Sequence, residues 1–325
     1  MEARRGNSAA GHAEPRLGAQ APRDDAARQL RVALIQLAIC DGQPAVNLEH
    51  AAASIRSAGP ADLYVLPELW TTGYAHDTWA RVADQETPAI VESLAALAAE
   101  RGAYIAGSMI SRNERGALVN RLWLVPPDGA APVHYDKGHL FAPMGEDRYL
   151  SPGDRRVVAS LGGWRAGLSI CFDLRFPEMY RADALDGAEL FLIVSEWPAA
   201  RAEAQRVLAR ARAIENQAFV VLCNRVGTAA DGTRFDGGSV VVAPDGSILA
   251  DAGGDEGIAR ATLDVDAIRA LRRQMPLLEL RREGLDWAAT HRSWESAPRR
   301  GPSVAPPPED HRTRAAPAEP VTACP

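Results

Sequence analysis

The stretch Trp164-Arg-Ala-Gly-Leu-Ser-Ile-Cys171-Phe-Asp-Leu-Arg-Phe-Pro177-Glu-Met-Tyr180 combines a strand, a turn and a helix start. The apolar run from Ala166 to Ile170 predicts a buried strand. Pro177 and Glu178 predict a helix start, because proline favours the first helical turn and an acid suits its positive end. Cys171 falls in the turn between them, where backbone N–H groups, and the helix if it begins close enough, can lower the pKa of a thiol. The position suits a nucleophile, although a lone free cysteine is more often a small buried apolar residue.

The composition is that of an ordinary globular protein with enough apolar residues for a large core. The chain has 325 residues and is 46% hydrophobic, and its formal net charge of -6 offers no basic excess for nucleic acid or an anionic membrane. No apolar run approaches the length of a membrane span, and the N-terminus lacks the apolar region of a signal peptide. The cysteines are scattered, without metal-like spacing. We therefore expect a cytoplasmic protein with no metal, no nucleic-acid partner and no membrane partner.

The two ends of the chain differ in composition from its middle. Residues 1–29 are rich in Ala, Gly, Pro, Arg and Asp, and they contain too few large apolar side chains to form a core. Residues 297–325 are rich in proline. We therefore predict two disordered tails around one folded domain at residues 30–296.

Within that domain, short β-rich runs alternate with helical patterns, which predicts an α/β fold with sheets covered by helices. The predicted strands are residues 31–38, 62–66, 103–110, 118–125, 132–136, 166–170, 189–195, 219–224, 238–243 and 258–263. The predicted helices are residues 47–57, 88–101, 177–185, 201–217 and 264–271.

Three candidate functional residues, Glu68, Lys137 and Cys171, each follow a predicted strand, and active sites in such sheets collect at the carboxyl ends of strands. Alone, Glu68 could begin a helix and Lys137 could be a solvated surface lysine. Together they supply a base for the thiol, positive charge for an oxyanion and a proton for a leaving amine, which is the chemistry of acyl transfer from an amide. A papain-like dyad with His134 or His139 is the less favoured alternative, which geometry must decide.

Around these residues the sequence resembles the nitrilase superfamily of carbon–nitrogen hydrolases over nearly all of residues 31–285. The similar segments are Leu66-Pro-Glu-Leu, Tyr135-Asp-Lys-Gly-His-Leu-Phe, Ser169-Ile-Cys-Phe-Asp-Leu-Arg-Phe-Pro-Glu, Arg212-Ala-Ile-Glu-Asn-Gln-Ala-Phe-Val and Cys223-Asn-Arg-Val-Gly. Gly138 departs from the pattern, since a larger residue is usual there. The resemblance implies that residues 30–296 form a carbon–nitrogen hydrolase domain with a four-layer α-β-β-α sandwich, no cofactor and commonly a homodimer. The predicted helix at 201–217 is either a dimer surface or an ordinary amphipathic helix.

The resemblance also implies a role for each site residue. Glu68 would take the thiol proton and later activate water. Cys171 would attack the amide carbon and form a thioester with loss of ammonia. Lys137 and the backbone N–H of Phe172 would hold the oxyanion, and Glu146, a few residues before Ser151-Pro-Gly-Asp, would position substrate or water.

Nitrilases, aliphatic amidases, carbamoyl-amino-acid hydrolases and ω-amidases share this triad. The segments Cys171-Phe-Asp-Leu-Arg-Phe-Pro-Glu and Ser195-Glu-Trp-Pro-Ala-Ala-Arg are most similar to the ω-amidase branch, which hydrolyses α-keto acid monoamides such as 2-oxoglutaramate and 2-oxosuccinamate. Arg175 and Arg201 are candidates to bind the free carboxylate of such a substrate, and an ion pair such as Arg175 with Asp173 is the structural alternative. Residues that could line the pocket, or merely belong to the core, are Trp70, Tyr74, Met144 and Trp197.

Alternatives remain open at this point. Within the class, the substrate could be deaminated glutathione or a carbamoyl amide, or the thioester could pass to an amine rather than to water. In a different class, the chain could be a catalytically silent interaction protein on the same scaffold, but the presence of Glu68, Lys137 and Cys171 together argues against that function.

Overall fold

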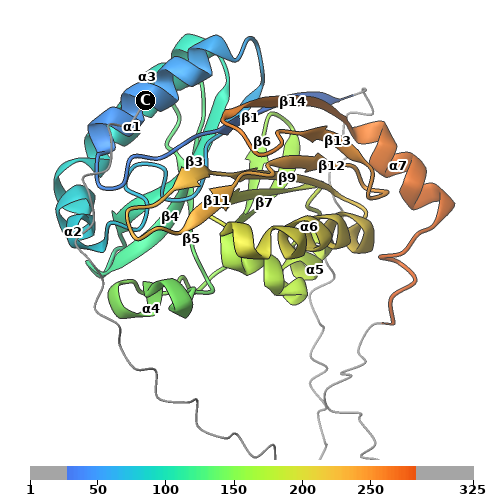
Figure 1. Cartoon of the computed structure of the whole chain (residues 1–325). Helices are drawn as coiled ribbons and strands as arrows, with labels where there is room; N and C mark the ends of the chain where they lie inside the picture. The colour runs from blue at the N-terminus through green and yellow to red at the C-terminus, as the bar shows by residue number, and fades with distance from the viewer. Residues whose placement is uncertain (1–27, 283–325) are drawn as a thin grey trace, which may run out of the picture.

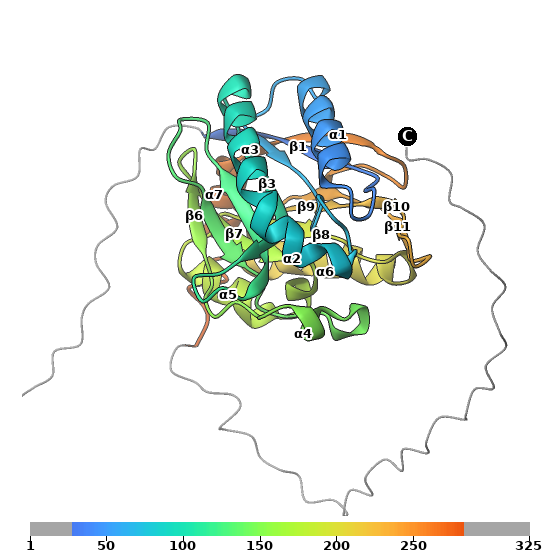
Figure 2. The same cartoon turned by 90° about the vertical axis from the view of Figure 1, so that its left-hand side faces the viewer.

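The computed structural model describes residues 28–282, which form two six-stranded sheets between two layers of helices (Figure 1). The first sheet has the strand order β14-β1-β2-β3-β4-β5, and the second has the order β13-β12-β9-β8-β7-β6. Helices α1 and α3 lie side by side over the outer face of the first sheet, and α5 and α6 cover the outer face of the second (Figures 1 and 2). The predicted four-layer α-β-β-α sandwich is therefore confirmed.

The first sheet consists of β14 (Gly257–Asp264), β1 (Gln29–Gln36), β2 (Leu63–Val65), β3 (Tyr104–Arg112), β4 (Leu118–Val125) and β5 (Val133–Asp136). The second consists of β13 (Ile248–Asp251), β12 (Val240–Val242), β9 (Phe219–Asn224), β8 (Leu190–Ser195), β7 (Trp164–Ile170) and β6 (Val158–Leu161). A separate hairpin joins β10 (Val226–Thr228) to β11 (Arg234–Asp236).

The α-helices are α1 (Pro44–Ser57), α2 (His76–Gln85), α3 (Thr87–Arg101), α4 (Glu146–Tyr149), α5 (Pro177–Leu185), α6 (Ala202–Asn216) and α7 (Val265–Gln274). Three short 3-10 helices are η1 (Ala142–Met144), η2 (Cys171–Arg175) and η3 (Ala199–Arg201).

Side chains along β1 alternate between two hydrophobic cores. Leu30, Val32 and Leu34 lie in the core between the two sheets, whereas Ala33 and Ile35 lie in the core between the first sheet and its helices. Successive strand residues point to opposite faces, so a strand buried on both sides reads as a continuous apolar run. Burying each large aliphatic side chain contributes roughly 1.5–3 kcal/mol.

The parallel strand pairs bring the site residues to one end of the sandwich. β2 is parallel to β1 and β3 in the first sheet, and β8 is parallel to β7 and β9 in the second. β5 runs in the direction of β3, because β4 is antiparallel to both. The carboxyl ends of β2 and β5 therefore lie at one edge of the first sheet, whereas Cys171 follows β7 of the second sheet.

Prediction from the sequence misses several short helices and strands. β6 and β13 form the edges of the second sheet. Each has only four residues, and three of the four residues of β13 are exposed, so their apolar runs are too short to stand out in the sequence. The helix α2 carries a recognisable helical pattern in its buried Trp79, Val82 and Ala83, and the prediction overlooked it. Gln29, assigned to the N-terminal tail, begins β1. Arg28 of that tail is also described and pairs with Glu189. Residues 1–27, the C-terminal tail and residues 283–296 of the predicted domain lie outside the described residues.

Within residues 28–282, no helix is both long enough and apolar enough to cross a membrane.

Candidate active site

Three of the predicted site residues form one buried hydrogen-bonded group. Lys137 Nζ donates to Glu68 Oε1 at 2.8 Å and to Glu146 Oε1 at 2.7 Å. Glu68 follows β2, Lys137 follows β5 and Glu146 begins α4. All three side chains are 0% exposed. The structure therefore places one ammonium group between two carboxylates at the predicted end of the sandwich.

Neighbouring groups fix both carboxylates. Asn120 Nδ2 donates to Glu68 Oε1 at 2.7 Å, and the backbone N–H of Glu196 donates to Glu68 Oε2 at 2.8 Å. The Tyr74 hydroxyl donates to Glu146 Oε1 at 2.9 Å, and the backbone N–H of Phe141 donates to Glu146 Oε2 at 2.6 Å. Each oxygen thus has its own donor, which orients the carboxylates.

Cys171 lies where β7 ends and η2 begins, and the side chains of Glu68 and Ser195 lie close enough to affect the pKa of its thiol. Its backbone φ of 46° lies in the left-handed region that residues with a side chain rarely adopt. Leu69, directly after Glu68, has a φ of 43°. Such strained backbone is concentrated at functional sites, where the surrounding structure holds it in place.

The thiol of Cys171 is not activated by a helix field, contrary to one sequence-based expectation. The helix α5 begins at Pro177, beyond the short η2. Burial, followed by the charge of Glu68, raises the pKa of the Cys171 thiol well above its ordinary value. The resting side chain is therefore a thiol, and its reaction as a nucleophile requires a base.

The pKa values of Glu68 and Lys137 suit this requirement for a base. Burial raises the pKa of Glu68, although the nearby Lys137 acts to lower it. Burial alone would lower the pKa of Lys137, but the charges of Glu146 and Glu68 raise it above its ordinary value. Lys137 therefore stays an ammonium, and Glu68 is a stronger proton acceptor than an exposed glutamate.

Among residues 28–282, the groups that affect the Cys171 thiol are Glu68, Lys137 and Ser195 rather than a histidine, and Asp173 pairs with His139 rather than with Arg175. His139 Nδ1 lies 2.8 Å from Asp173 Oδ1, and the His139 ring stacks on Phe176 at 3.6 Å between ring centroids. Asp173 also accepts from the Tyr135 hydroxyl at 2.9 Å and from the backbone N–H of Ile170 at 2.9 Å. Asp173 is thus fully engaged in fixing the turn at the nucleophile. His134 faces Glu114 instead.

A small cavity opens beside the nucleophile. Its lining consists of Phe141, Cys171, Phe172, Arg175, Trp197, Pro198 and Arg201. The Arg175 guanidinium lies 4.9 Å from the Trp197 ring centroid, and the Arg201 guanidinium lies 5.4 Å from the Phe141 ring centroid. Within residues 28–282, neither guanidinium has a carboxylate partner. The cavity therefore presents two cations beside the thiol.

Three proposed pocket residues do not line this cavity. Tyr74 instead holds Glu146, Met144 lies half-buried in η1, and Trp70 is fully buried in the core between the first sheet and its helices. A larger surface hollow runs along β5, between residues 113–115 and residues 151–155, but it contains none of the four catalytic candidates.

Sequence reasoning missed Asn120 and Glu196, both of which bind Glu68. Both residues could have been found from the sequence. Asn120 is a polar residue inside the apolar strand β4, and Glu196 is a charged residue directly after the apolar strand β8. Between residues 28 and 282, no group of three or more His, Cys, Asp or Glu side chains could hold a metal ion.

Comparisons with known proteins identify the family to which this chain belongs. The carbon-nitrogen hydrolase family matches residues 31–273. The 2-oxoglutaramate amidase of Bacillus subtilis (strain 168) is 34% identical over 249 residues, covering 76% of this chain and 96% of that protein. Omega-amidase YafV of Escherichia coli (strain K12) is 37% identical over 249 residues, covering 76% and 94%. The crystal structure of XC1258 from Xanthomonas campestris, a CN-hydrolase superfamily protein, has a TM-score of 0.73 at 34% identity, covering 78% of this chain and 97% of that one. This chain therefore belongs to the carbon–nitrogen hydrolase family of the nitrilase superfamily.

Proposed function

We propose that the protein hydrolyses the ω-amide of small α-keto acid monoamides, such as 2-oxoglutaramate and 2-oxosuccinamate, to the dicarboxylate and ammonia. The observation that carries this proposal is the buried group of Glu68, Lys137 and Cys171 beside a cavity with two guanidinium groups that lack carboxylate partners among the described residues. The relatives named 2-oxoglutaramate amidase and omega-amidase support the same substrate class.

The first half of the reaction forms a thioester. Glu68 takes the Sγ proton of Cys171 while the sulfur attacks the amide carbon, since burial leaves the thiol protonated until a substrate arrives. The carboxylic acid of Glu68 then gives this proton to the nitrogen of the tetrahedral intermediate. The carbon–nitrogen bond breaks, ammonia leaves, and the acyl group stays on Sγ.

Lys137 and Phe172 supply the oxyanion donors. An ammonium group has three N–H donors, and Lys137 uses two of them on Glu68 and Glu146, so the third is available to the substrate oxygen. Phe172 lies in the first turn of η2, where backbone N–H groups have no acceptor within the helix. Removing one such donor from an acyl-transfer enzyme typically lowers kcat by about 10²–10³-fold.

The second half of the reaction returns the enzyme to its resting state. Glu68, again a carboxylate, takes a proton from water, and the resulting hydroxide attacks the thioester carbon. The same donors hold the second oxyanion. The carbon–sulfur bond breaks, Sγ regains its proton from Glu68, and the product leaves with a new carboxylic acid group that ionises in solution to give the dicarboxylate. Glu146 holds Lys137 in place through both halves.

Arg175 and Arg201 suit the substrate end that does not react. A guanidinium binds a carboxylate through two parallel hydrogen bonds, and both arginines lie on the cavity that also exposes Cys171. An α-keto acid monoamide is short and carries a single carboxylate, so it matches a small cavity with a cation beside the nucleophile. The Arg175 guanidinium packs over the Trp197 ring, which limits the orientations that it can take.

The test is a panel of small amides with ammonia release as the readout. We expect kcat/KM for 2-oxoglutaramate and 2-oxosuccinamate to exceed that for L-glutamine, the matched control with an amine in place of the keto group. Deaminated glutathione and an N-carbamoyl amino acid complete the panel, and Cys171→Ala serves as the blank. Activity on either of these two, with none on the keto acid amides, would contradict the proposed substrate.

We further infer that the protein acts as a homodimer, and we expect it in the cytoplasm, where a reducing environment keeps Cys171 available. Val207 and Ile214 are exposed on α6, and Leu185 is exposed at the end of the adjoining α5. An exposed apolar group on the helical layer of the second sheet supports pairing through that layer. Analytical ultracentrifugation of Val207→Glu/Ile214→Glu should show monomers, and an unchanged sedimentation coefficient would contradict this interface.

A further inference from the structure

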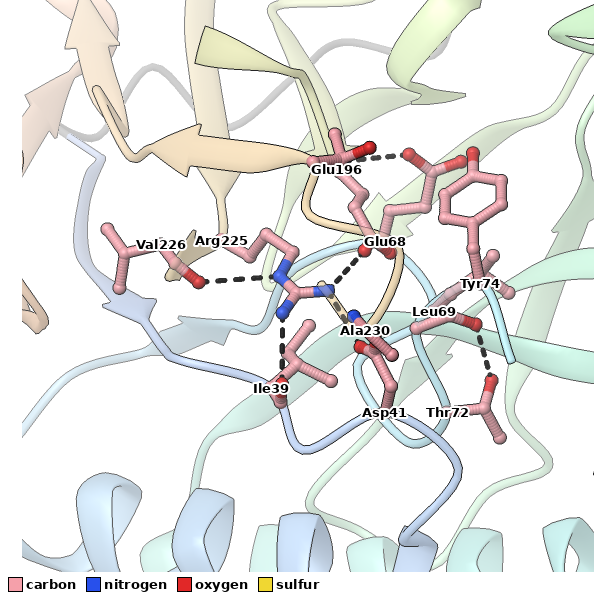
Figure 3. A network of polar contacts seen from close by, with 12 residues as sticks. Ile39, Asp41, Glu68, Leu69, Thr72, Tyr74, Glu196, Arg225, Val226 and Ala230 are labelled. Atoms are coloured by element: carbon pink, nitrogen blue, oxygen red, sulfur yellow. Dashed lines mark hydrogen bonds and ion pairs between the residues drawn. The ribbon is translucent and has the colours of Figure 1, made fainter. Parts of the chain in front are cut away.

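A second group of buried charges lies directly behind Glu68 (Figure 3). Arg225 follows β9 and is 0% exposed, and Glu196 follows β8 and is 1% exposed. Arg225 forms an ion pair with Glu196, and its Nη1 lies 3.2 Å from Asp41 Oδ1. The reaction proposed above uses neither Glu196 nor Arg225, although they come from two segments, Ser195-Glu-Trp-Pro and Cys223-Asn-Arg-Val-Gly, that resemble the family.

The peptide bond between Ser195 and Glu196 connects this group to Glu68. The backbone N–H of Glu68 donates to the Ser195 carbonyl at 3.3 Å, and the backbone N–H of Glu196 donates to Glu68 Oε2 at 2.8 Å. One peptide unit therefore binds both the main chain and the carboxylate of Glu68. Any shift of this peptide moves the carboxylate relative to Cys171.

Arg225 holds the side chain that extends from this peptide. Its Nη2 donates to the Ile39 carbonyl at 2.9 Å and its Nε donates to the Val226 carbonyl at 3.4 Å (Figure 3). Its guanidinium lies 4.6 Å from the Phe235 ring centroid. The guanidinium is thus anchored to the loop after β1 and to the β10–β11 hairpin at the same time. Glu196, bound to this fixed cation, cannot move without breaking a buried ion pair.

Stability alone is a weak reason for such a pair. Removing two charges from water costs free energy that their attraction recovers only in part, so apolar residues in the same place often give an equally stable protein. Burial raises the pKa of Glu196 to about 8 even though Arg225 acts to lower it. Glu196 Oε2 has no hydrogen-bond partner among residues 28–282. The pair therefore suits a role in geometry better than a role in stability.

We propose that Glu196 and Arg225 are positioning residues for the general base. Arg225 fixes the side chain of Glu196, and the Ser195–Glu196 peptide then fixes the backbone and the carboxylate of Glu68 in line with Cys171. This inference rests on the role of Glu68 as the general base, which is part of the proposed function.

The experiment compares Arg225→Met, Glu196→Gln and the double variant with a matched control. The control is Arg28→Met, which removes the arginine partner of Glu189 just before the other end of β8. We expect Arg225→Met to lower kcat about tenfold to a hundredfold with little change in KM, since a small misplacement of a catalytic group has that effect. The double variant should lose no more than Arg225→Met, because the two residues act as one unit.

Two readouts separate positioning from stability. Arg225→Met should move the acid limb of the kcat/KM profile to higher pH, because it removes a buried positive charge that lies close to Glu68. It should also slow the alkylation of Cys171 by iodoacetamide about tenfold at neutral pH, measured by mass spectrometry of the peptide that contains Cys171. Arg28→Met should lower the melting temperature without either change.

Arg225→Met and Glu196→Gln variants that lose stability as the control does, but keep kcat, the pH profile and the alkylation rate, would overturn the proposal. Should Arg225→Met not fold, Glu196→Gln and the conservative Arg225→Lys decide, with a smaller loss of kcat expected for both. The alkylation readout needs no substrate. If the wild-type protein releases no ammonia from keto acid amides, the proposed substrate fails while the positioning of Glu68 is still tested.

Discussion

Two buried clusters in this protein have the same composition, one cation between two carboxylates: Lys137 with Glu68 and Glu146, and Arg225 with Glu196 and Asp41. They differ in whether the cation keeps a hydrogen-bond donor available for a substrate. The ammonium of Lys137 binds two carboxylates and keeps one donor beside Cys171. The guanidinium of Arg225 also binds two main-chain carbonyls and faces an aromatic ring. The comparison indicates that a buried cation serves chemistry where a donor stays available, and serves geometry where all sides are engaged.

The largest expected effect comes from removing the cation with the available donor. Lys137→Met should lower kcat/KM by at least about 10³-fold, because the oxyanion loses a charged donor. It should also destabilise the fold, since two buried carboxylates then face each other. Steady-state kinetics and thermal unfolding measure the two effects. A variant that folds and keeps a tenth of the wild-type kcat/KM would show that Lys137 does not contact the reacting atoms.

A smaller effect is expected for the carboxylate that holds Lys137 without touching the thiol. Glu146→Gln keeps an acceptor for the Tyr74 hydroxyl but removes the charge that orients the ammonium. We expect kcat to fall about tenfold to a hundredfold. A loss as large as that of Lys137→Met, with an altered acid limb, would instead make Glu146 a proton carrier.

The pH profile of kcat/KM should reflect the first cluster. Glu68 must be ionised to act as a base, and burial raises its pKa, so the acid limb should lie above the ordinary glutamate range near about 4.3. The pKa values of Cys171 and Lys137 are both raised, so no alkaline loss is expected below about pH 9. Rates at each pH, corrected for the folded fraction, test this profile. An alkaline limb near neutrality would contradict it.

Outside both clusters, substrate binding should respond to the cavity arginines. Arg175→Ala should raise KM for 2-oxoglutaramate about tenfold with a small effect on kcat, because a carboxylate contact far from the reacting carbon is the same in ground and transition states. Arg201→Ala is the matched comparison. If neither variant changes KM, another cation binds the carboxylate.

The smallest expected effect is on the pH dependence of the free energy of unfolding. Burial raises the pKa of Glu196 to about 8 in the folded protein, above the unfolded value, so the folded state binds the extra proton. Stability from this group is complete below the unfolded pKa and is lost as the pH rises towards about 8, with a slope of up to about 1.4 kcal/mol per pH unit. Urea unfolding of Glu196→Gln between these limits should show a flatter pH dependence. An unchanged slope would mean that Glu196 is ionised throughout.

Much of the fold could be predicted because its strands are buried and its turns are marked. The strands β7, β8 and β9 are continuous apolar runs, and the structure confirms all three. The edge strands β6 and β13 could not be predicted in this way, because each has only four residues and β13 is mostly exposed.

The site residues also differ in whether the local sequence identifies them. Glu68, Lys137, Cys171 and Glu146 could be located because each lies in a local segment that resembles the family. The contacts of Glu196 could not, because Arg225 lies 29 residues away and Glu68 lies 128 residues away in the chain. Such pairs depend on which strand ends the fold brings together, and local sequence does not encode that directly.

The central claim is that Cys171 carries the acyl group while Glu68 transfers its protons. The most direct measurement is rapid quenching of the protein with 2-oxoglutaramate, followed by mass spectrometry of the peptide that contains Cys171. The account predicts an adduct with the mass of the substrate minus ammonia, which disappears as the dicarboxylate forms and is absent in Cys171→Ser. Ammonia release with no adduct on Cys171, or turnover retained by Cys171→Ser, would contradict it.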